Sequence, residues 1–536
     1  MHELLLLCIG LILSISLLVL LARKLRIAYP IFLVLAGLAI GFLPGIPNMR
    51  INPDLVFLVI LPPILFDAAQ NSSWRAMWRW RRIILVMAIG FVLFTATAVA
   101  FVSCWLIPGF TLAEGFLLGA IISPPDAAAA TAVLQYVRLP KGLVSILEGE
   151  SLLNDATSLT VFRFALAAIL TSDFSWGNAI GGFVLVSLSG IAIGLIFGLL
   201  FYAIYRWLPT SSNLDFALSL VLPYLIYLTA EGLHSSGVLA VVAGGLFIAY
   251  QNHFIFSHSS RLKANAIWPA IVFILNAVVF FLIGLQLPDI AAMINTVSLT
   301  HSIIIALIIA LIVIVVRMLS AYSSSVFTQF ISKYITVAQS KPGWRNPTII
   351  GWTGMRGVVS LASALAIPLM MPNGHTFPHR NLILFITFVV IIVTLVGQGS
   401  MLPWLIRKVK PEYLIDEDPD DQQLLKIDIH LLNAAMTHLE NKYSDDVAAN
   451  KLVRNKLELL RCKISLYHDT DIDEDKRKNL NKMLDRFKRV MVEVTEHQRR
   501  ELHSFRHKDH FDDDVIALIE RRLDLEEERL EEEESD

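Results

Sequence analysis

Thirteen apolar segments occupy most of residues 1–410 and constrain the fold more than any other feature of the chain. A helix needs roughly 20 apolar residues to cross the hydrocarbon core of a bilayer. Only 17% of the residues are charged, whereas soluble domains carry about a quarter. We therefore predict an all-α, polytopic membrane protein. The predicted spans are 4–22, 28–48, 54–71, 83–107, 111–136, 142–171, 178–207, 213–231, 233–252, 265–287, 301–328, 347–371 and 381–406.

Charge divides the chain into two parts. Of the 44 Lys and Arg residues, 23 lie in residues 1–410 and 21 crowd into residues 411–536. This predicts a transmembrane domain followed by a charged tail. Residues 424–459 and 476–494 have the apolar spacing of amphipathic helices. A regulatory or dimer-stabilising role for the tail and a merely solvated tail are both compatible with this pattern.

Basic residues in the loops predict the orientation. The loops after the odd-numbered spans hold 18 Lys and Arg, whereas the loops after the even-numbered spans hold only Arg50 and Arg380. Because positive loops mark the cytoplasmic side, the N-terminus is predicted outside and the tail inside. After the third span, Trp74, Trp78 and Trp80 alternate with arginines, as in an interfacial belt against lipid, and nucleic-acid binding is not expected.

Two spans contain residues that interrupt a helix. Span 5 holds Ser123-Pro124-Pro125-Asp126, and span 12 holds three glycines within 351–357, around Arg356. If spans 1–6 and 8–13 are six-helix repeats of opposite direction joined by span 7, the interruptions occupy matching positions. Such matched, crossed and unwound helices mark the ion site of a transporter, and Asp126 and Arg356 can offset the partial charges of the helix ends. The alternative is that Pro and Gly merely kink two packed helices.

Ionisable residues inside the spans are costly and therefore functional candidates. Four acids face three bases, so one carboxylate is left without a basic partner, and burial makes such a group bind a proton more readily. In span 6, Ser151, Asp155 and Ser158 share a helix face. Their oxygens suit a hard cation, although a helix-packing network is the alternative. The seven candidates are Asp67, Asp126, Glu150, Asp155, Arg163, Arg317 and Arg356.

Four stretches carry a resemblance to a known family. The sequence resembles the monovalent cation:proton antiporter-1 family, which includes bacterial NhaP-type antiporters and animal Na⁺/H⁺ exchangers, over nearly all of residues 1–410. The matching stretches are Leu61-Pro62-Pro63-Ile64-Leu65-Phe66-Asp67, Ser123-Pro124-Pro125-Asp126, Gly149-Glu150-Ser151-Leu152-Leu153-Asn154-Asp155 and Gly354-Met355-Arg356-Gly357-Val358-Val359-Ser360.

The resemblance implies an ion site in span 6. Asp155 would bind either the cation or protons, and Ser151 and Asp67 would add cation ligands. Asn154 stands where electrogenic relatives have a second Asp, which implies electroneutral one-for-one exchange. Many relatives have Thr-Asp-Pro at the first interruption, where this chain has Pro125-Asp126-Ala127. The Thr hydroxyl is therefore absent, and the backbone carbonyl of Pro125 is the cation ligand that remains there.

The resemblance also implies the surroundings of the site. Glu150 would pair with Arg317, and Asp126 and Arg356 would lie where the unwound helices cross. The role of Arg163 is open between pairing with Asp67 and reaching the outer interface.

The implied protein is a homodimer in the plasma membrane, the bacterial inner membrane. Spans 4–6 and 11–13 would form a core that moves like an elevator against a dimerisation part of spans 1–3 and 8–10. The expected activity is exchange of Na⁺, with K⁺ and Li⁺ left open, for H⁺ in cytoplasmic pH and sodium homeostasis. No cofactor is expected. A channel and an intramembrane enzyme are the competing classes, but filter loops, HExxH and GxSxG are missing from the sequence.

Overall fold

The computed structural model describes residues 2–43, 53–134, 137, 139–171, 176–292, 299–331, 343–371, 374–412, 420–470, 474–505, 519–520 and 522–527. Over these residues the chain is helical and has no strand beyond an isolated bridge between Met370 and Thr376. It divides into two compact units, Met1–Ile415 and Asp416–Asp536.

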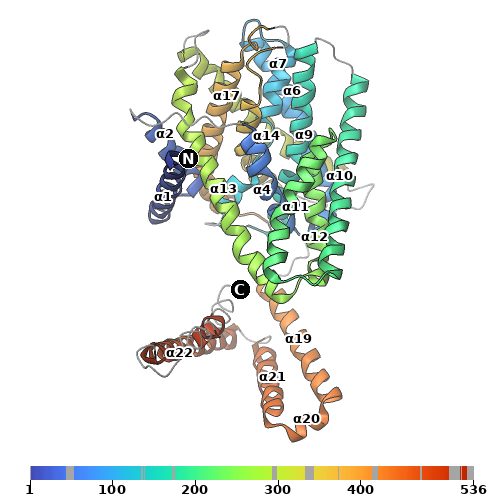
Figure 1. Ribbon diagram of the computed structural model, residues 1–536, viewed down its shortest axis with the longest axis vertical. Helices are drawn as coiled ribbons and strands as arrows, with labels where there is room; N and C mark the ends of the chain where they lie inside the picture. The colour runs from blue at the N-terminus through green and yellow to red at the C-terminus, as the bar shows by residue number, and fades with distance from the viewer. Residues whose placement is uncertain are drawn as a thin grey trace. The chain divides into compact units, whose positions relative to one another are not determined.

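The first unit is a bundle of helices, several of them interrupted (Figure 1). Its elements are α1 (His2–Leu25), α2 (Tyr29–Gly41), α3 (Pro53–Leu55), η1 (Val56–Ile60), α4 (Leu61–Asn71), α5 (Trp74–Leu85), η2 (Val86–Phe91), α6 (Val92–Leu106), α7 (Leu112–Ile122), α8 (Ala127–Leu134), α9 (Lys141–Thr171), α10 (Trp176–Trp207), α11 (Ser212–Gly232), α12 (Gly237–Ile255), α13 (His258–Ala292), α14 (Leu299–Ile331), α15 (Arg345–Trp352), α16 (Val358–Leu365), α17 (Arg380–Ile392), η3 (Val393–Gln398) and α18 (Gly399–Val409).

Helices lie within the predicted spans, but the number of thirteen membrane crossings stays a prediction. Nine continuous stretches among the described residues are long and apolar enough to cross a membrane, and α2 and α7 are shorter apolar helices. Predicted spans 5 and 12 are each two short helices, α7 with α8 and α15 with α16. The end of span 2 and the end of span 5 lie outside the described residues. The chain is therefore an all-helical, multi-pass membrane protein.

The surface of α10 is that of a helix facing lipid. Only 17% of the most apolar 18-residue stretch of α10 is buried inside the protein. Leu185, Leu188 and Ile196 are each more than 60% exposed. Large exposed apolar surfaces are unusual on soluble monomers. The surface of α10 therefore fits a bilayer as its solvent.

Glycines allow the backbones of neighbouring helices to come close. A side chain at Gly284 of α13 would collide with the backbone carbonyl of Val34 on α2, and one at Gly37 of α2 would collide with that of Phe281. Small residues at such positions are the usual way for membrane helices to pack tightly. The pair of α2 and α13 therefore forms a rigid wall beside the cavity described below.

A buried ion pair joins α9 to α14. Arg317 donates to both carboxylate oxygens of Glu150, with N–O distances of 2.6 and 2.7 Å. The side chains are 3% and 1% exposed. This bidentate geometry is the strongest form of Arg–carboxylate contact. It fixes the middle of α9 relative to α14.

The second unit contains α19 (Asp420–Lys442), α20 (Ser444–Ala449), α21 (Lys451–Thr470) and α22 (Glu474–Phe505). The helix predicted over 424–459 is interrupted at Tyr443 and Asn450, so α19 and α21 form a hairpin closed by α20. Arg461 contacts Glu440 across this hairpin at 2.6 Å. Residues beyond 527 lie outside the described part of the chain.

Gly284→Leu tests the close packing of α2 on α13. Overpacking a tight interface costs about 1–3 kcal/mol, so we expect a lower melting temperature in detergent. Gly181→Leu on α10, where a side chain would meet no atom within 4 Å, is the control and should melt like the wild type. Equal melting temperatures for both variants would contradict the packing described here.

Glu150→Gln tests the buried ion pair. It leaves Arg317 in the interior without a counter-charge, and breaking such a pair costs about 3–5 kcal/mol. We expect a clear fall in the melting temperature. Combining Glu150→Gln with Arg317→Met removes both charges and should recover part of the loss. A single variant that melts like the wild type would rule out a stabilising role.

Candidate functional site

The interruptions of the two broken helices meet inside the bundle. The backbone amide of Asp126, which precedes α8, donates to the carbonyl of Met355 in the second interruption at 2.7 Å. A non-helical backbone at this depth is stable only where it is surrounded by protein or lines a cavity. The two interruptions satisfy this requirement partly by bonding to each other.

Arg356 lies where two helices end. Its guanidinium donates to the carbonyl of Ile122, the last residue of α7, at 2.8 Å, and to that of Ser123 at 3.4 Å. It also donates to the carbonyl of Gly354, just beyond α15. Arg356 is fully buried. A positive charge is favourable there because the C-terminal ends of helices carry a partial negative charge.

Asp126 lies where two helices begin. One oxygen of its carboxylate accepts from the amide of Ala129 in the first turn of α8, at 3.4 Å. A side chain at Gly357, the residue before α16, would collide with this carboxylate. Helix N-termini carry a partial positive charge. Asp126 therefore complements the two N-termini as Arg356 complements the two C-termini.

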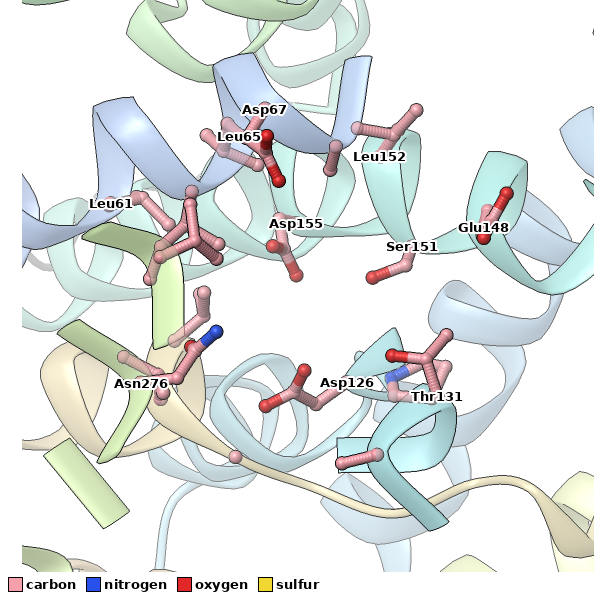
Figure 2. A pocket seen from close by; sticks show the side chains of 18 of the residues that line it. Leu61, Leu65, Asp67, Asp126, Thr131, Glu148, Ser151, Leu152, Asp155 and Asn276 are labelled. Carbon is pink, nitrogen blue, oxygen red and sulfur yellow. The ribbon is translucent and has the colours of Figure 1, made fainter. Parts of the chain in front are cut away.

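A cavity of about 390 Å³ lies next to the crossing. This volume has room for many waters. Figure 2 shows Asp67 and Asp155 on one side, Asp126 on the opposite side, and Asn276 between them at one end. Ser151 points into the same space. The cavity therefore combines carboxylate, hydroxyl and amide groups from α4, α9, α13 and the interruption before α8.

The polar face of α9 serves two purposes. Asp155 is 8% exposed and lines the cavity together with Ser151. The side-chain amide of Asn154 instead donates to the carbonyl of Pro125 at 3.0 Å. Ser158 donates to the carbonyl of Ala120 at 2.8 Å. Asn154 and Ser158 thus attach α9 to the broken helix, whereas Ser151 and Asp155 face the open space.

The structure corrects one alternative for Arg163. Arg163 contacts Glu231 of α11 at 2.6 Å, and both side chains are partly exposed. A pairing with Asp67 is therefore wrong. Asp67 instead accepts from the amide of Asn71, one turn further along α4, at 3.1 Å. Pairing with Glu231 at the end of α11 is favourable because the pair keeps contact with the surface.

Three polar residues of the interior were not among the sequence candidates. Glu148 and Asn276 line the cavity, and Asn276 could have been noticed as the one amide between Ala266 and Leu285, a stretch that is otherwise apolar. Glu114 is 1% exposed and accepts from the backbone amide of Thr111 at 2.6 Å and contacts His379 Nδ1 at 2.9 Å. Its spacing from Thr111 is that of a capping box, which was the available signal.

The donor set is not that of a tightly held metal ion. Within the described ranges, no three His, Cys, Asp or Glu side chains form a cluster that could hold a metal. Hard cations accept hydroxyl, amide and carbonyl oxygens as well as carboxylates. A cation in this cavity would depend on such mixed oxygens, which suits transient binding.

The amino-acid sequence is similar to known cation exchangers. It is 31% identical over 515 residues to an uncharacterized Na⁺/H⁺ exchanger of Mycobacterium tuberculosis, covering 95% of this chain and 93% of that protein. It is 34% identical over 388 residues to a sodium, potassium, lithium and rubidium/H⁺ antiporter of Bacillus subtilis, covering 71% of this chain and 58% of that protein.

The fold is similar to that of a solved antiporter. The sodium proton antiporter MjNhaP1 from Methanocaldococcus jannaschii superposes with a TM-score of 0.60 at 20% identity, covering 76% of this chain and all of that one. The family model for the transmembrane part of sodium/hydrogen exchangers matches residues 10–408. This match covers the whole helical bundle that surrounds the cavity, and the chain therefore belongs to the sodium/hydrogen exchanger family.

Proposed function

We propose that the protein is a secondary antiporter that exchanges Na⁺ for H⁺ by moving Asp155 between the two sides of the membrane. The observation that carries this proposal is the position of Asp155, a carboxylate beside the crossing of two broken helices, in a cavity that other carboxylate, hydroxyl and amide side chains also line. A carboxylate that binds either a proton or a cation, but not both at once, couples proton movement across the membrane to cation movement in the opposite direction.

The distribution of the ligands between helices supports an elevator-type movement. Asp126, Ser151 and Asp155 lie on α8 and α9 or beside them, in the proposed core of α5–α9 and α14–α18. Asp67 lies on α4, in the proposed dimerisation part of α1–α4 and α11–α13. Residues of both parts line the cavity, so movement of the core would carry Asp155 past Asp67 and Asn276. Thirteen spans in two inverted repeats joined by α10 give the two parts this arrangement.

The extent of the cavity supports an inward-facing state. The lining residues run from the middle of each helix toward the end next to a basic loop: 61–71 on α4, 148–155 on α9 and 269–276 on α13. Basic loops face the cytoplasm. The N-terminus is then outside, the second unit is cytoplasmic, and Asp155 is reached from the cytoplasm.

The proposal extends to the cation and the assembly. Relatives are named for exchange of sodium alone or of sodium, potassium, lithium and rubidium, so Na⁺ is proposed as the substrate, with K⁺ and Li⁺ to be compared in the same assay. A homodimer in the plasma membrane that maintains cytoplasmic pH and sodium completes the proposal.

Asp155→Asn tests the carrier. The change keeps the size of the side chain and removes the group that titrates, so we expect Na⁺-dependent proton movement in proteoliposomes to disappear. The variant should elute and melt as a folded protein, which separates loss of transport from loss of fold. Saturable exchange in the wild type that dissipates a preset pH gradient distinguishes an antiporter from a channel. Exchange by the variant at the wild-type rate would refute the proposal.

Electroneutral exchange is the second expectation, and it follows from Asn154. The amide of Asn154 does not titrate, Asp126 complements two helix ends, and Glu150 is paired with Arg317. Asp155 then exchanges one proton for one Na⁺. A membrane potential acts at about 2.3 kcal/mol per charge per 100 mV, and it should leave the reversal condition unchanged when imposed with K⁺ and valinomycin. A shift of the reversal condition with potential would mean that more than one proton moves per cation.

A further inference from the structure

Asn276 has an unusual position on α13. The side chain is 4% exposed, and its Oδ1 atom has no hydrogen-bond partner among the described residues. A buried polar atom without a partner costs free energy, typically about 1–3 kcal/mol. Most such atoms in folded proteins have a partner. In the working protein, a water or a cation in the cavity would supply the partner that Asn276 lacks.

The surroundings of Asn276 indicate what this partner is. Asn276 lines the cavity, and its amide end points toward the space between Asp155 and Asp126 (Figure 2). Two carboxylates facing one small space attract a cation. The oxygen and nitrogen of an Asn side chain exchange places when the amide turns over. The same side chain can therefore donate to a carboxylate when the site is empty and present its oxygen to a cation when the site is filled.

We propose that Asn276 is a ligand of the transported cation in the inward-facing state. The proposal rests on the antiport function proposed above and adds a ligand from the part of the protein that stays in place. An amide oxygen is a suitable ligand for a hard monovalent cation. It also supplies an uncharged oxygen, so binding through Asn276 leaves the charge balance of the exchange unchanged.

The location of Asn276 predicts that it affects cation binding from one side of the membrane only. Ser151 and Asp155 lie on α9 and move with the core, whereas α13 packs against α2 in the part that stays. When the core carries the cation outward, Asp155 and Ser151 remain with it and Asn276 is left behind. Asn276 therefore strengthens binding from the cytoplasm and leaves binding from the outside unchanged. An asymmetric affinity of this kind favours export of Na⁺ at low cytoplasmic concentrations.

The test compares the two faces of the membrane. Everted vesicles expose the cytoplasmic face and right-side-out vesicles expose the external face, and the half-saturating Na⁺ concentration is measured in both. For Asn276→Leu we expect it to rise about tenfold on the cytoplasmic side, equivalent to about 1.4 kcal/mol, with little change on the external side. Asn276→Asp retains an oxygen and should bind Na⁺ from the cytoplasm at least as well as the wild type.

Two controls separate a ligand from a structural residue. Ser151→Ala removes an oxygen that moves with the core and should raise the half-saturating concentration on both sides. Gln286→Leu removes another buried amide of α13 that does not line the cavity, and it should leave both values unchanged. Wild-type values for Asn276→Leu, an equal rise on both sides, or the same defect in Asn276→Asp or Gln286→Leu would overturn the inference. A wild type without exchange would instead refute the antiport function itself.

Discussion

The requirement that every backbone group in a membrane interior finds a partner governs this structure. Two helices are interrupted in the middle of the bundle, which leaves four helix ends without continuation. Arg356 donates to carbonyls beside both C-terminal ends, and Asp126 lies against both N-terminal ends. Each charge is stabilised by the partial charges it faces. Because Asp126 and Arg356 complement the helix ends, the neighbouring carboxylate of Asp155 is not needed for that purpose, as its proposed role in exchange requires.

The cavity is lined by helices from both of the proposed groups, and this arrangement bears on how the proposed ion site could move. The lining includes Asp155 and Ser151 of α9 and, at one end, Asn276 of α13, which is held against α2 by close glycine contacts. The bidentate contact between Glu150 and Arg317 fixes α9 within its own group of helices. Contacts of this kind within each proposed group of helices, together with a cavity that both groups line, are what the proposed movement requires.

The sequence was sufficient to predict an all-helical membrane protein and it indicated where two helices are interrupted, because both follow from strong local rules. Apolar length identifies the helices, and Pro124, Pro125 and the glycines around Arg356 identify the interruptions. The contact of Arg163 with Glu231 could not be foreseen, because it depends on the position of α9 relative to the end of α11. Asn276 was missed for a similar reason: an amide in an apolar helix becomes significant only when the other residues that line the cavity are known.

The hydrogen bond from Asn154 to the carbonyl of Pro125 has a consequence for how such proteins evolve. An ionised carboxylate at this position would place two acceptors against each other and lose this hydrogen bond, leaving Ser158 to attach α9 to the broken helix. A protonated carboxyl group could keep it. A descendant that acquired Asp at position 154 would therefore gain a second proton-binding group. Its hydrogen bond to the carbonyl of Pro125 would form when the group is protonated and break when it is ionised. Stoichiometry and mechanical stiffness would change together in one mutational step.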